Sequence, residues 1–126
     1  MVFSFVVFSA FAKAQTCGIS ATDVSFGSVN PGSSSTLKDT SVTNSGDTSA
    51  SLTISGQDWT DGAGHNMTFS QTFWNTTSAP VALTNSFVSV DTIAPSIPFV
   101  IHLSVQIPAR QFAATYNQII TLEATC

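Results

Sequence analysis

Charged side chains are scarce in this sequence. Asp, Glu, Lys and Arg make up 8% of the chain, against roughly 25% in an average soluble domain. Only three residues are Lys or Arg, and the net charge is −4. Because the chain has no basic patch to neutralise phosphates, we expect no nucleic-acid partner, and an acidic membrane surface would repel it. Ser and Thr make up more than a quarter of the residues, a composition common in secreted and cell-surface β proteins.

Catalytic motifs are missing as well. The sequence has no G-x-S-x-G, no H-E-x-x-H and no paired-cysteine motif. Its two histidines, His65 and His102, are far apart in the sequence, and we expect His102 on the outward face of a strand. No Cys–His pair is free for nucleophilic chemistry if both cysteines are bonded. The sequence therefore predicts a protein that is not an enzyme, with no catalytic residue and no cofactor.

Helical periodicity is absent after the N-terminal segment, and strand-like alternation takes its place. Apolar residues occupy alternate positions from Phe99 to Ile107 and, with one exception, from Tyr116 to Cys126. Pro108–Gln111 forms a turn, so these two strands are predicted to pair as a hairpin. Five earlier strands are predicted at 18–26 (kinked near 22–23), 37–42, 50–55, 67–73 and 81–90. This pattern predicts an all-β fold, an immunoglobulin-like two-sheet β-sandwich of about seven antiparallel strands.

The N-terminal segment has two interpretations. Val2–Ala12 is an apolar run followed by Ala12-Lys13-Ala14, which fits a signal peptide of residues 1–14 removed before Gln15. No Lys or Arg follows Met1, so the usual positive start is missing, and the run is too short for a membrane span. Alternatively the segment is retained as a strand of about 36 Å that fills a groove in a neighbouring subunit. In both cases residues 15–126 form a single sandwich domain.

Two cysteines, Cys17 and Cys126, lie at the two ends of that domain. In an exported protein they are expected to form a disulfide, which would close a loop of about 110 residues and contribute roughly 4–5 kcal/mol. Seven antiparallel strands would put the two ends of the domain at opposite poles, too far apart for a bond. A kink or an eighth strand would allow pairing within the subunit, whereas pairing between subunits would give a covalent head-to-tail filament.

The polar loop 58–66 is the most suggestive cluster for ligand binding. Oxygen donors at Asp58, Asp61 and Asn66 among glycines could hold Ca²⁺, although their spacing is not that of a calcium-binding loop. A loop without an ion is the simpler expectation, so no metal site is predicted. Trp59 and Trp74, with Phe73, could form a flat platform for a sugar, or they could belong to the core.

Two N-glycosylation patterns are present, at Asn66-Met67-Thr68 and at Asn75-Thr76-Thr77. Such patterns are functional only in an exported protein. They occur often by chance in a chain rich in Ser and Thr, but here both flank one predicted strand. Glycans at Asn66 and Asn75 would cover a surface that carries few charges.

Four blocks of sequence, at 23–32, 42–47, 54–60 and 114–121, together resemble secreted β-sandwich proteins of archaeal cell surfaces. The likeness extends to subunits of archaeal extracellular filaments (threads and bundling pili) and to TasA-like fibre proteins. The opening Cys-Gly-Ile-Ser with the later Phe-Gly resembles, more weakly, spore-coat-U and chaperone–usher pilin domains. The resemblance covers most of residues 17–126 and implies donor-strand complementation, in which an N-terminal strand of one subunit completes the sandwich of the next.

These observations predict a structural subunit of an extracellular filament or pilus, located at the cell surface and binding copies of itself. If residues 2–12 are the donor, Phe3, Phe5, Val7 and Phe11 are expected to enter the groove. The alternative is a monomeric secreted binding or adhesion module, dependent on glycan or calcium, that uses the loop 58–66 and Trp59. Surface glycans or other cells would then be its partners.

Overall fold

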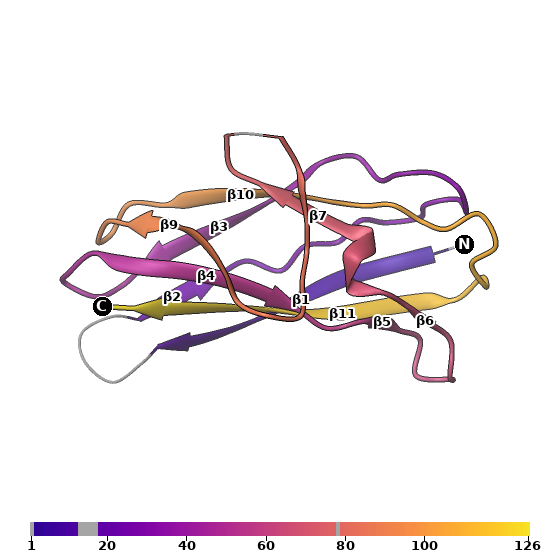
Figure 1. Cartoon of the computed structure of the whole chain (residues 1–126), viewed down its shortest axis with the longest axis horizontal. Helices are drawn as coiled ribbons and strands as arrows, with labels where there is room; N and C mark the ends of the chain where they lie inside the picture. The colour runs from indigo at the N-terminus through magenta and orange to yellow at the C-terminus, as the bar shows by residue number, and fades with distance from the viewer. Residues whose placement is uncertain (1, 13–17, 78) are drawn as a thin grey trace.

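The computed structural model describes residues 2–12, 18–77 and 79–126, the first of these ranges by its backbone. It confirms the all-β fold: two sheets face each other as a sandwich (Figure 1). The first sheet has the order β6-β5-β11-β4-β9, with β1 paired to β11, and the second has the order β2-β3-β10-β7-β8.

The first sheet consists of β1 (Val2–Ala12), β4 (Ala50–Gly56), β5 (Trp59–Thr60), β6 (Asn66–Met67), β9 (Val88–Ile93) and β11 (Thr115–Thr125). The second consists of β2 (Ile19–Ala21), β3 (Lys38–Asn44), β7 (Thr72–Asn75), β8 (Val81–Ala82) and β10 (Phe99–Val105). Among the described residues the only helical turn is the 3₁₀ turn η1 (Phe69–Gln71).

The core lies between the sheets and follows from the alternation in the sequence. On β10 the buried row includes Ile101 and Leu103, and on β11 it includes Ile120 and Leu122, all fully buried. Each such side chain contributes roughly 1.5–3 kcal/mol when it leaves water. His102 lies in the alternate, outward row of β10 as predicted, and its Nδ1 is 2.5 Å from Oδ1 of Asp39 on β3.

The predicted hairpin of the last two strands is wrong, because β10 and β11 belong to different sheets. The connection between them crosses the sandwich and begins with the predicted turn, in which Gln111 N–H donates to Pro108 O over 3.2 Å. Tyr116 then donates its hydroxyl to Phe112 O over 2.9 Å. A tyrosine that bonds back to the chain four residues earlier, at the corner before a strand, is a feature of immunoglobulin-like sandwiches.

Two other predicted strands are each divided between the sheets. The segment 67–73 leaves the first sheet after β6, passes through η1 and enters the second sheet as β7. The segment 81–90 becomes β8 in the second sheet and β9 in the first. The polar loop predicted at 58–66 contains the short strand β5. Alternation of apolar residues shows that a segment is extended, but it does not show which sheet the segment joins.

The expectation of opposite poles for the domain ends is also wrong. Gly18, next to β2, accepts a hydrogen bond from Ser45 N–H over 2.8 Å, and Thr125 pairs with Ser51. Both contacts surround the turn between β3 and β4, so the two ends lie at one pole. The reason is that the single strand predicted at 81–90 consists of two strands, β8 and β9, which run in opposite directions. The additional strand brings the chain back to the end of the sandwich at which it started.

This geometry bears on the predicted disulfide. Cys126 directly follows β11, whereas Cys17 lies outside the described residues. The pairing of Cys17 with Cys126 therefore stays a prediction. The shared pole of Gly18 and Thr125 favours a bond within the subunit over one between subunits, because a disulfide requires Cα atoms within about 7 Å of each other.

Candidate functional site

The most unusual structural feature is the outer edge of β11. On one side this strand pairs with β4 and, at Asn117, with β5. On its other side it pairs in parallel with β1, from Val2 opposite Thr115 to Ala12 opposite Ala124, with one irregularity between Phe3 and Phe5. Without β1, β11 would be the edge of its sheet, with a row of unpaired backbone N–H and C=O groups along one side.

The β1–β11 register separates the predicted donor residues into two rows. Phe3 lies opposite Tyr116, which belongs to the buried row of β11. Phe5, Val7 and Phe11 lie opposite Asn117, Ile119 and Glu123, which belong to its outward row. The residues opposite the rest of the buried row are Val6, Phe8, Ala10 and Ala12.

A buried polar network fixes β11 from the inside. Thr72 on β7 donates its hydroxyl to Oε1 of Gln118 over 2.8 Å and accepts the indole N–H of Trp59 over 2.9 Å. Gln118 in turn donates its Nε2 to Gln57 O over 2.9 Å. Thr72 and Trp59 are fully buried, and Gln118 is 1% exposed. The network joins the two sheets, and the sequence gives little sign of it beyond polar residues in otherwise apolar rows.

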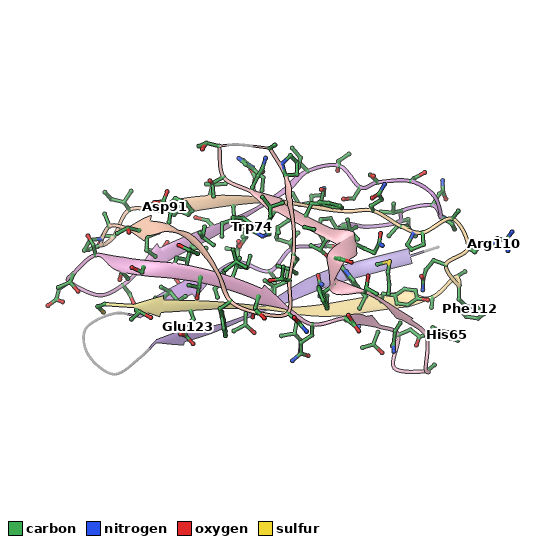
Figure 2. The ribbon with its side chains drawn as sticks, viewed as in Figure 1. His65, Trp74, Asp91, Arg110, Phe112 and Glu123 are labelled. Carbon is green, nitrogen blue, oxygen red and sulfur yellow. The ribbon has the colours of Figure 1, made fainter. Side chains whose placement is uncertain are left out.

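Of the two alternatives for the tryptophans, the structure shows the core positions, and the sugar platform does not form. Trp59 is fully buried, with its indole N–H committed to Thr72, and its ring centroid lies 6.1 Å from that of Phe26. Trp74 is 8% exposed and lies inside the sandwich (Figure 2). Neither indole offers a face to a ligand.

The three weak candidates for calcium ligands, Asp58, Asp61 and Asn66, have separate hydrogen-bonding roles or none toward a common point. Asp58 accepts the backbone N–H of Phe69 through Oδ1 over 3.0 Å. Asp61 accepts the N–H groups of Ala63 and His65 through Oδ1, and its Oδ2 lies 2.6 Å from Nδ1 of His65. Asn66 is exposed on β6. Within the described ranges no group of three His, Cys, Asp or Glu side chains could hold a metal ion.

The loop around Asp61 is held to the opposite connection by ring stacking. The rings of His65 and Phe112 are parallel within 5° and have centroids 3.9 Å apart (Figure 2). Gln111 adds a 3.2 Å bond from its Nε2 to Asn66 O. Burial raises the pKa of Asp61, but hydrogen bonds from Ala63 and His65 outweigh burial and hold this pKa below its ordinary value.

Of the predicted glycosylation residues, Asn66 is exposed, and Asn75 is half-buried at the end of β7. Their modification stays a prediction. In the described part of the chain no helix is long and apolar enough to cross a membrane.

No protein-family model matches the sequence, and no curated protein is significantly similar to it. The structure is similar to part of a family 123 glycoside hydrolase from Clostridium perfringens, known from work on glycolipid glycan hydrolysis, with a TM-score of 0.53 and 12% identity. The match covers 76% of this chain, which spans 19% of the enzyme's length. At this identity the likeness concerns the fold alone.

Proposed function

We propose that this protein is a non-catalytic structural subunit of an extracellular filament or pilus. Copies of the chain join head to tail by donor-strand complementation, and residues 2–12 are the donor strand. The joint is the edge of β11. The hydroxyl-rich, weakly charged surface and the two glycosylation patterns support a location at the cell surface.

The supporting observation is the pairing of β1 along nearly the full length of β11. An added strand satisfies the backbone groups of an open sheet edge, and its alternate side chains fill the groove below. Within one chain, β1 completes its own sheet. If β1 is transferred to the next copy, each contact with β11 is replaced by an identical one, which is why exchange of a terminal element is a low-cost route to assembly.

The register refines which donor residues matter most. A donor strand that completes the core would place its side chains beside the buried row of β11, and Val6 and Phe8 are opposite Gln118 and Ile120 in that row. Neighbouring residues of paired strands share a face of the sheet. We therefore favour Val6 and Phe8 as groove residues together with Phe3, and we assign Phe5 and Val7 to the alternate row.

The first test is the unreduced intact mass of the exported protein. A mass that includes residues 2–12 is expected. A chain that begins at Gln15 has lost the donor segment, and this result would refute the proposed mechanism.

The second test compares two double variants of equal chemistry. Val6→Asp with Phe8→Asp places charges opposite the buried row and should abolish filaments, since an unpaired charge in an apolar groove is strongly unfavourable. Phe5→Asp with Val7→Asp is the matched control and should leave filaments visible by electron microscopy. If filaments are lost only in the control, the row assignment is wrong, and if both variants form normal filaments, the donor proposal is wrong.

A further inference from the structure

An open groove of about 540 Å³ lies on the outer face of the first sheet, away from the core. Its floor includes Ser55 on β4 and Thr121 on β11, which are cross-strand neighbours. Three separate connections supply its walls: Gln57 and Asp58 between β4 and β5, Phe69 in η1, and Asn85 and Phe87 between β8 and β9. In Figure 1 the connection from β8 to β9 passes across the front of the sandwich.

Backbone hydrogen bonds hold these walls in place. The crossing connection is tied to both sheets, because Leu83 N–H donates to Thr72 O over 2.8 Å and Gly56 N–H donates to Thr84 O over 2.9 Å. Asp58 holds η1 through its 3.0 Å bond to Phe69 N–H. The groove is therefore formed by fixed backbone, and a ligand would not need to order it on binding.

The lining combines aromatic faces with polar groups that have spare hydrogen-bonding capacity. Phe87 is 49% exposed, and Phe69 is half-buried. No described residue hydrogen-bonds to the side chain of Gln57, Asn85 or Thr121. Asp58 uses only Oδ1 toward described residues, so Oδ2 can accept a further hydrogen bond.

This composition restricts the chemical class of the ligand. An anion is disfavoured, because Asp58 is the only charged residue of the lining. One carboxylate is too few to hold a metal ion. A purely apolar ligand would desolvate the polar floor and walls without giving them new hydrogen bonds. A sugar ring matches the lining, since its C–H face packs on an aromatic ring and its hydroxyls both donate and accept hydrogen bonds.

We propose that this groove is a binding site for a neutral saccharide. It is distinct from a platform at Trp59, which is not among its lining residues. It does not depend on filament formation, because its lining comes from residues 55–121 of one chain. Phe87 is the stacking residue, and Asn85 and Asp58 bond to the sugar hydroxyls.

The test is a glycan array of neutral and acidic oligosaccharides probed with the labelled full chain. The array is repeated with the Val6→Asp/Phe8→Asp variant, which should not form filaments but should still bind the sugar. Failure of the proposed filament and failure of the proposed sugar site are thereby distinguished. Phe87→Ala should weaken binding to the retained neutral glycans roughly tenfold, as expected for an aromatic anchor. Asn85→Ala should weaken it as well. Phe112→Ala is the matched control: this phenylalanine is also exposed, at 57%, but lies outside the groove.

Retention of neutral glycans with loss of affinity in Phe87→Ala and no change in Phe112→Ala supports the site. Three results overturn it: no neutral glycan is retained, only acidic glycans are retained, or Phe87→Ala binds as well as the parent chain. Each variant is first shown to unfold cooperatively at a temperature close to that of the parent chain, so that loss of binding is not loss of fold.

Discussion

The hydroxyl of Thr72 links β7 in the second sheet to Trp59 and Gln118 in the first sheet. Removing this hydroxyl tests how much the link stabilises the fold. Thr72→Val keeps the shape of the side chain and removes only the hydroxyl. Oε1 of Gln118 then loses its donor and the indole N–H of Trp59 loses this acceptor, both in the core. A buried polar group that loses its partner costs about 1–3 kcal/mol, so for two such groups we expect the free energy of unfolding to fall by about 2–6 kcal/mol. That is a large share of the roughly 5–15 kcal/mol of a typical domain.

The assay is urea denaturation followed by tryptophan fluorescence, with Thr72→Ser as the control. Serine keeps the hydroxyl and loses one buried methyl group, so it should cost only about 1 kcal/mol. If Thr72→Val is no more destabilising than Thr72→Ser, the hydroxyl contributes nothing and the reasoning fails.

A double-mutant cycle extends this test. Gln118→Leu alone leaves the Thr72 hydroxyl without its acceptor, but combined with Thr72→Val it removes both polar partners at once. Replacing both partners by apolar groups of similar shape is much less costly than removing one. The double variant should therefore be more stable than the sum of the single effects predicts. Gln57 O, which loses the Nε2 of Gln118, belongs to an exposed residue and can bond to water instead.

Two further predictions concern the loops. Because hydrogen bonds hold the folded pKa of Asp61 below its unfolded value, its carboxylate stabilises the fold above the unfolded pKa and this contribution disappears as the pH falls through the folded pKa. The melting temperatures of the parent chain and of Asp61→Asn should thus differ at neutral pH and converge in acid, and a constant difference would contradict this. Gly56→Ala would place a Cβ in steric conflict with Cδ2 of the buried Leu83 and should lower the free energy of unfolding by about 1–3 kcal/mol. In the Gly56→Ala chain, the further substitution Leu83→Ala should lower the free energy of unfolding by less than it does in the parent chain.

The class of the fold could be predicted because apolar alternation depends only on which face of a strand is buried. The rows of β10 and β11 follow from Phe99–Ile107 and Tyr116–Cys126 without any knowledge of their partners. Partner choice does not follow in the same way. A single cross-over, such as η1 between β6 and β7, moves a segment to the other sheet while its alternation continues almost unchanged.

Because the sequence does not show which sheet a segment joins, it also does not show which residues come together in a candidate site. Trp59 and Asp58 are neighbours in the sequence, yet the indole lies in the core while Asp58 lines a surface groove. Side chains of successive residues in an extended segment point to opposite sides, so closeness in sequence does not place them in one site. Phe87 lines the groove beside Asp58 and Thr121 because the connection from β8, in the second sheet, to β9, in the first, passes there. The sequence does not show that β8 and β9 belong to different sheets. The β1–β11 edge is different, because the apolar segment 2–12 is compatible in sequence with a signal peptide or with a donor strand, and only the register shows which of its residues lie opposite the buried row. The sequence can therefore suggest a donor strand, but it cannot suggest a groove that is formed by four segments far apart in the chain.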